Sequence, residues 1–92
     1  MLYPYITLGD GTEVLHTQII TENETEKIEV HFERAEEEGF AVARCVLPTY
    51  EWIRKEKFNE EEIELFEKLL ESNSALIYKC ARSGGLKIAQ HF

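Results

Sequence analysis

The stretch that decides the fold is residues 27–47, KIEVHFERAEEEGFAVARCVL. Its first part alternates strictly between apolar and polar side chains. The apolar set is Ile28, Val30 and Phe32, and the polar set is Glu29, His31 and Glu33. A period of two maintained over seven residues predicts a β-strand at 27–33 with one buried face.

The second part of this stretch predicts another strand, over residues 40–47. Its side chains are apolar on both faces, which is typical of a central strand covered on both sides. Arg44 is the exception, and we expect it to need a partner or a path to water. Glu36 to Gly39 predict the hairpin connection, and Pro48 ends the strand because it cannot donate to a ladder.

Working outward toward the N-terminus, two further strands are expected. Residues 2–8, LYPYITL, are aromatic and β-branched, and Pro4 predicts that this strand either lies at an edge of the sheet or begins late. A turn is predicted at 9–11, Gly-Asp-Gly. Residues 12–21 form the second candidate, although their alternation is imperfect.

The C-terminal half is helical in pattern. Asn59 is a good N-cap with Glu62 as its capping-box partner, and apolar residues follow at helical spacing. We expect one helix over 60–71, a break at Ser72-Asn73-Ser74, and a second helix over 74–82 that ends at Gly84-Gly85. A single kinked helix is the alternative.

Together these elements predict an α+β fold: an antiparallel sheet of about four strands followed by two C-terminal helices packed on one face. The length of 92 residues suits one domain, 1–92. It would consist of a strand-rich part (1–50), a helical part (59–83) and a short tail (86–92), which is either a short strand or frayed.

Composition excludes several classes of protein. The chain has 10 Lys and Arg against 18 Asp and Glu, a net charge of −8. Its cations are dispersed, so we expect no nucleic-acid partner. No apolar run is long enough to span a membrane, and the start lacks the features of a signal peptide, so a cytoplasmic location is expected. In that reducing compartment Cys45 and Cys80 would be free thiols.

Few residues suggest chemistry. His31 is the best catalytic candidate, a weak one, because Glu29 and Glu33 flank it on the same strand face. The alternative is a solvated strand face. His16 and His91 have no local support. His16, His31, Cys45 and Cys80 are suitable metal ligands, but none has the pair spacing of a zinc module, so neither a metal nor a cofactor is expected.

The apolar side chains outnumber what two short helices on one sheet face can cover. The second face would need curling of the sheet, the C-terminal tail or a partner subunit. Tyr50, Trp52, Arg54 and Arg44 are the interface candidates. For Trp52 the alternative is that it caps the edge of the core together with Phe58.

Three segments carry a family resemblance: IEVHF at 28–32, FNEEEI at 58–63 and the helical stretch 73–81. From about residue 26 to residue 83 the chain resembles a group of small bacterial domains of unknown function that are associated with toxin–antitoxin-like pairs. Glu29 stands where that group has a second histidine. The resemblance implies a cytosolic bacterial module that acts through protein contacts.

Three functional hypotheses follow. The leading one is a non-enzymatic protein-interaction module, either a homodimer or one component of a regulatory pair. The second is a small hydrolase or nuclease centred on His31 with Glu29 or Glu33. The third is a peptide- or ligand-binding domain that uses Trp52 and Tyr50.

Overall fold

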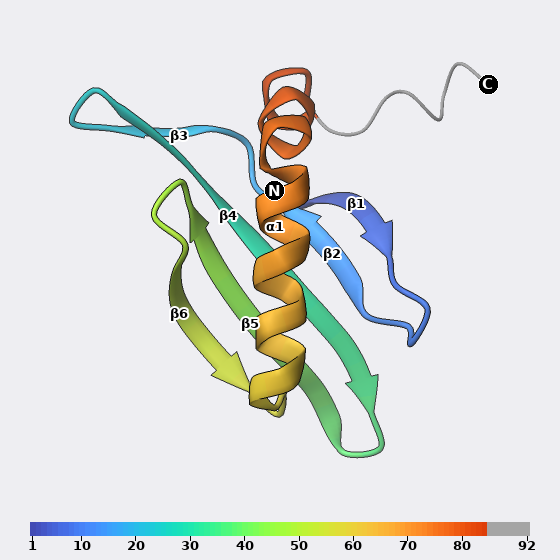
Figure 1. Ribbon diagram of the computed structural model, residues 1–92. Coiled ribbons are helices and arrows are strands. Elements are labelled where there is room, and N and C mark those ends of the chain that lie inside the picture. The colour runs from blue at the N-terminus through green and yellow to red at the C-terminus, as the bar shows by residue number, and fades with distance from the viewer. Residues whose placement is uncertain (85–92) are drawn as a thin grey trace.

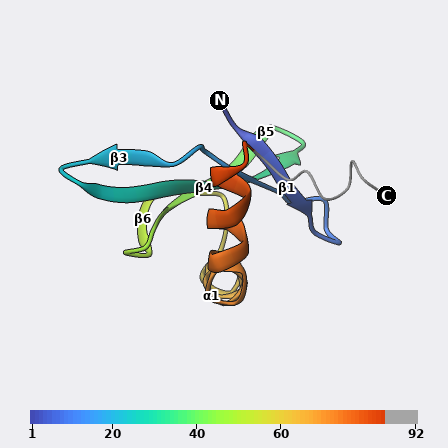
Figure 2. The same cartoon turned by 90° about the horizontal axis from the view of Figure 1, so that it is seen from above.

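The computed structural model describes residues 1–84 and contains one antiparallel sheet and one helix. The elements are β1 (Tyr3–Thr7), β2 (Glu13–His16), β3 (Ile20–Glu22), β4 (Thr25–Glu36), β5 (Gly39–Leu47), β6 (Glu51–Glu56) and α1 (Glu60–Arg82). The strand order is β1-β2-β4-β5-β6, with β3 pairing to the start of β4. Figure 1 shows α1 lying across the sheet, and Figure 2 shows that it occupies one side only. The α+β class and the antiparallel sheet are therefore confirmed.

The number of strands was underestimated, since the sheet has six rather than four. One reason is that the expected strand at 12–21 is split into β2 and β3, which pair with different parts of β4. Thr17 lies between them. Its amide donates to Glu29 O at 3.0 Å, and its hydroxyl accepts from the Glu29 amide at 3.1 Å. This side chain takes the place of a backbone acceptor, so the ladder is interrupted there.

The other missed strand is β6, which was expected to be a polar connection. This strand pairs with β5. The residue before it, Tyr50, and the residue after it, Lys57, both have positive φ, 61° and 65°. Its polar, irregular pattern has a structural reason: β6 is an outer strand with a β-bulge, and five of its six residues are exposed. An exposed edge strand buries few side chains on either face, so apolar and polar residues need not alternate along it. Its sequence therefore shows little of the pattern that predicts a strand.

β1 lies at the opposite edge of the sheet, which is one of the two alternatives expected from Pro4. It also carries an irregularity, between Pro4 and Ile6. The predicted connections at residues 9–11 and at Glu36–Gly39 are confirmed as the β1–β2 and β4–β5 turns.

The prediction of two helices is wrong, because α1 runs unbroken from Glu60 to Arg82. Asn73 was expected to lie in a break between two helices, but it lies inside α1 and its side chain forms two hydrogen bonds. Its amide nitrogen donates to Leu69 O at 2.8 Å, and its Oδ1 accepts from the Tyr5 hydroxyl at 2.7 Å. Asn73 thereby links the helix to β1, and its bond to the Leu69 carbonyl four residues earlier is made within the continuous helix.

The predicted ends of the helical region are confirmed. Asn59 caps α1 by accepting from the Glu62 amide at 2.8 Å, and Glu62 returns the bond to the Asn59 amide at 3.1 Å. After the C-cap Ser83, Gly84 has a φ of 78°, the left-handed conformation that favours glycine. Gly85 and the tail 86–92 lie outside the described residues.

The core lies between α1 and the inner sides of β4 and β5. Phe32 stacks on Phe66 with centroids 4.2 Å apart, and Phe58 meets Phe66 edge-on at 5.0 Å. The expectation that residues 40–47 are covered on both sides is wrong for residues 1–84. Alanine, cysteine and leucine side chains of β5 face the helix, and no described element covers the other side.

Candidate functional site

The sheet side turned away from α1, here called the open face, is made by residues that alternate with the core. Its members are Glu13, Leu15, Glu29, His31, Glu33, Val42, Arg44, Val46, Glu51, Arg54 and Glu56. Their sequence neighbours on β2, β4 and β5 are buried against the helix, so these side chains point the other way.

Strand register arranges the open face in three rows. The central row crosses four strands as Leu15, His31, Arg44 and Arg54. One acidic row runs beside it as Glu13, Glu33, Val42 and Glu56, and the other as Glu29, Val46 and Glu51. Adjacent rows are two residues apart along each strand, about 7 Å. The open face therefore carries two arginines in its central row, and glutamates lie in the rows on both sides of it.

His31 lies in the middle of the central row and is only 5% exposed. Its Nε2 donates to Glu29 Oε1 at 3.2 Å, since a carboxylate can only accept. Burial lowers the pKa of His31; the hydrogen bond with Glu29 opposes this effect, and the charge of Arg44 adds to it. The ring is therefore neutral at neutral pH, and its Nδ1 is a buried acceptor with no donor among the described residues.

Arg44 is the next member of the row and differs from the other arginines. Arg34, Arg54 and Arg82 each form an ion pair with a carboxylate. Within residues 1–84 no such pair exists for Arg44, and its Nε is buried without a hydrogen-bond partner. Its neighbour across β6 is Arg54, a like charge. Glu56 interacts with Arg44 through its charge but lies beyond ion-pair distance, so among the described residues the desolvation of this half-buried guanidinium is offset only in part.

The structure brings three of the candidate residues together and separates two. His31, Arg44 and Arg54 are neighbours on β4, β5 and β6. Trp52 lies on the helix side instead, with its ring 5.8 Å from that of Phe32. Tyr50, in the β5–β6 turn, packs against the core. This geometry favours the alternative for Trp52, that it caps the edge of the core.

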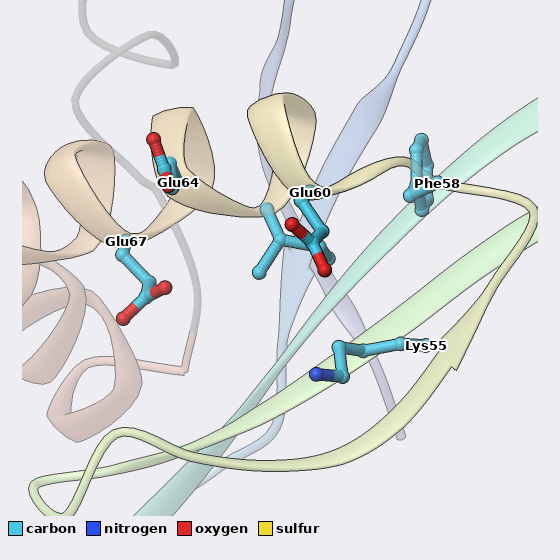
Figure 3. A pocket seen from close by; sticks show the side chains of 6 residues that line it. Lys55, Phe58, Glu60, Glu64 and Glu67 are labelled. Atoms are coloured by element: carbon cyan, nitrogen blue, oxygen red, sulfur yellow. The ribbon is translucent and has the colours of Figure 1, made fainter.

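Two cavities of about 320 Å³ each lie on the helix side of the sheet. The first is lined by Lys55, Phe58, Glu60, Ile63, Glu64 and Glu67. In Figure 3 the carboxylates of Glu60 and Glu67 and the ammonium of Lys55 lie toward one another between α1 and β6. Sequence reasoning missed this groove. The helical spacing of the glutamates was a signal, but it needed β6 to be recognised as a strand.

The second cavity lies between α1 and the β1–β2 turn. It is lined by Leu8, Gly9, Asp10, Glu62, Leu65, Phe66 and Leu69. Neither His31 nor Arg44 lines either of these two cavities, and the same holds for Tyr50 and Trp52. The candidate catalytic and ligand-binding residues are thus outside both hollows.

The potential metal ligands are dispersed. Cys45 and Cys80 are free and buried, and burial raises the pKa of both thiols, that of Cys45 to about 12. His16 is fully buried, with Nδ1 2.7 Å from Thr17 O. In the part of the chain that the structure describes, no three His, Cys, Asp or Glu side chains are grouped so that they could hold a metal ion.

Comparison of the chain with protein-family models, with curated proteins and with solved structures finds no match. Across residues 1–84 no helix is both long and apolar enough to cross a membrane. The geometry of the open face is therefore the basis for a functional proposal.

Proposed function

We propose that this protein is a non-enzymatic interaction module that binds a protein partner through the open face. The observation that carries the proposal is the state of that face within residues 1–84. No described element covers it, and it holds two buried polar atoms, His31 Nδ1 and Arg44 Nε, that lack partners. Buried polar atoms are ordinarily satisfied, and a docked partner also removes sheet surface from water.

The apolar members of the open face support the same interpretation. Leu15, Val42 and Val46 are neither buried nor fully exposed. They lie among arginine and glutamate side chains, a mixture typical of protein interfaces that are not permanent. A partner would also meet a rigid surface, since five strands pair across it.

The enzymatic hypothesis draws less support from the geometry. A general base must reach the proton that it abstracts. The ring of His31 is 5% exposed, and its only hydrogen bond among the described residues is to Glu29. Trp52 and Tyr50 pack against the core, and neither residue lines either of the two cavities described above, so the ligand-binding hypothesis draws no support from them.

The resemblance to toxin–antitoxin-associated bacterial domains agrees with this proposal, because those domains act through protein contacts. It extends the proposal to a cytoplasmic module that forms one half of a regulatory pair, or pairs with itself. His31 then has a structural role in the interface rather than a catalytic one.

The test compares two substitutions of the same kind. Val46→Lys places a charge on the open face, and Leu76→Lys places one on the outer side of α1, where Leu76 is 46% exposed. Tagged wild-type protein and both variants are purified under native conditions, and bound protein is quantified by mass spectrometry and by light scattering. Circular dichroism checks that both variants fold.

We expect wild type and Leu76→Lys to retain the same associated protein, whether another chain or a second copy. Val46→Lys should lose it by about tenfold or more, because a buried charge opposes docking. Equal retention by the two variants would place the partner elsewhere. Absence of any associated protein in all three samples would contradict the proposal.

A further inference from the structure

We propose that the tail, residues 86–92, docks on its own molecule in a groove between α1 and β1. This groove, here called the leucine groove, is made by Leu65, Leu69 and Leu76 of α1 and by Leu8, which follows β1. The inference goes beyond the proposed function, because it concerns the helix side of the sheet and not the open face. It is carried by the uncovered leucines, by the length of chain that follows α1 and by the sequence of the tail.

The three leucines of α1 form a stripe along one side of the helix. Four residues separate Leu65 from Leu69, and seven separate Leu69 from Leu76, a spacing that returns to the same side of a helix. This stripe is distinct from the core face of α1, since Leu65 is 63% exposed and Leu76 is 46% exposed. Within residues 1–84 no element covers the stripe, although it is as apolar as a packed helix face.

The stripe borders β1. The second cavity, of about 320 Å³, has Leu65 and Leu69 on its helix wall and Leu8 on its opposite wall. Further along the helix, the hydrogen bond of Asn73 with the Tyr5 hydroxyl brings the same side of α1 against β1. The leucines therefore line a hollow between two elements, which an apolar segment can fill.

The tail has a suitable sequence, LKIAQHF, although its residues lie outside the described part of the chain. Leu86, Ile88 and Phe92 are at even positions. Successive side chains of an extended segment point to opposite sides, so these three apolar side chains would share one side. Gln90 shares that side and departs from the apolar pattern. An extended tail thus presents apolar side chains to the groove and polar ones to water.

The chain that follows α1 is long enough to reach the second cavity. A helix rises by about 1.5 Å per residue, so Leu65 lies about 26 Å from Arg82, the last residue of α1. Residues 85–92 can span about 26–29 Å when extended. The φ of Gly84, 78°, ends the helix and allows the chain to turn back. A tail that runs back along α1 would bring Phe92 to the cavity.

The open face is the competing position for the tail. α1 lies on one side of the sheet and the open face on the other, as Figure 2 shows. A tail bound to the open face would have to pass round an edge of the sheet, which uses part of its length. The leucine groove is formed by the helix to which the tail is joined. This connection gives a high effective concentration, so few contacts are needed for docking.

Nitrogen–proton correlation spectra of the full chain provide the test, because they report on each backbone amide separately. Two substitutions in the tail are compared. Phe92→Ser removes an apolar side chain from the side that would face the groove. His91→Ser changes the neighbouring residue, which would face water, and is the matched control.

We expect Phe92→Ser to shift the amide resonances of Leu8, Leu65 and Leu69, because the aromatic ring then leaves the cavity. His91→Ser should shift only the resonances of its neighbours in the sequence. The shifts should be equal at about 20 µM and at about 500 µM protein, since docking within one molecule does not depend on concentration.

A second pair of variants changes the helix. Leu65→Lys places a charge in the leucine groove, whereas Glu64→Lys places one at the adjacent position, which lines the first cavity on the other side of α1. We expect Leu65→Lys to move the resonances of residues 86–90 to the positions that they have in Phe92→Ser. Glu64→Lys should leave them unchanged.

Shifts confined to the tail in Phe92→Ser would overturn the inference, as would equal effects of the two lysine substitutions. Shifts that grow with protein concentration would show that the tail binds a second copy instead. Each of these results leaves the proposed function standing. Shifts at Val42 and Val46 would place the tail on the open face, and would contradict both this inference and the proposed function.

Discussion

Single side chains on the open face explain why this face is unusual for a sheet turned to solvent. His31 is only 5% exposed although it lies on the side of the sheet turned away from the core, and Glu29, Glu33 and Arg44 are the charged groups that act on its ring. Its one hydrogen bond among the described residues, to Glu29, leaves Nδ1 unsatisfied. The sequence indicated that His31 lies beside carboxylates, but not that it is buried, because burial depends on neighbouring strands.

The lowered pKa of His31 makes stability depend on pH. Burial lowers the pKa in the folded chain below the value of about 6.5 that holds in the unfolded chain. Below that pH the unfolded chain binds more protons, so the free energy of unfolding falls as pH decreases. Urea unfolding at about pH 7.5 and at about pH 5.5 should show this loss, and His31→Gln should reduce it. The same pH dependence in both proteins would contradict the expectation.

The two thiols should be unreactive in the folded protein. Burial raises the pKa of Cys45 to about 12 and also raises that of Cys80, so neither forms an appreciable thiolate near neutral pH. Titration with a disulfide reagent at about pH 8 should proceed slowly in buffer and rapidly for both thiols in guanidinium. Fast reaction of one thiol in the native state would show that it is accessible.

At the scale of elements, the helix and the first strand depend on each other. Asn73 connects α1 to β1 through the Tyr5 hydroxyl. This contact explains why three consecutive residues that favour helix ends lie within an unbroken helix. Local preference is a difference of less than about 1 kcal/mol per residue, and one tertiary hydrogen bond offsets it.

Removal of this hydrogen bond should be measurable. Tyr5→Phe leaves Asn73 Oδ1 without its donor, and we expect a loss of about 1 kcal/mol in the free energy of unfolding. Tyr3→Phe is the matched control on the same strand; no hydrogen bond of its hydroxyl occurs in the described residues, and its effect should be below about 0.5 kcal/mol. Chemical denaturation of both variants measures the difference, and equal losses would contradict the role of Asn73.

At the scale of the whole molecule, one helix holds one side of a six-stranded sheet. The centre of this contact is Phe66, 4% exposed, stacked on Phe32 and in edge contact with Phe58. A chain of this size has little stability in reserve, about 5–14 kcal/mol. The helix is therefore essential to the sheet, while the open face contributes comparatively little apolar burial.

Phe66→Ala should lower the free energy of unfolding by about 3–5 kcal/mol, because it removes a buried aromatic ring and leaves a cavity. Phe40→Ala is the matched control: Phe40 is 59% exposed, and its loss should cost less than about 1 kcal/mol. Urea denaturation of both proteins provides the comparison. Similar losses would show that the packing of α1 is not the main source of stability.

The amino-acid sequence by itself determined the features that depend on near neighbours. These include the strand at 27–33, its hairpin with the next strand and the Asn59 cap. Each follows from side-chain period, turn chemistry or backbone hydrogen bonding within a few residues. The residue types of the open face were also visible, since alternation separates His31 from the apolar residues.

Only the tertiary structure decided which surfaces meet. The two predicted helices form one helix, in which Asn73 contacts β1. Residues 51–56 form a strand because they pair with β5, and one side of β5 is uncovered within residues 1–84. The tertiary structure also placed His31, Arg44 and Arg54 in one row, although they are thirteen and ten positions apart in the sequence. The physical reason is that strand register and layer contacts arise from long-range burial. No local pattern encodes which distant residues will share it.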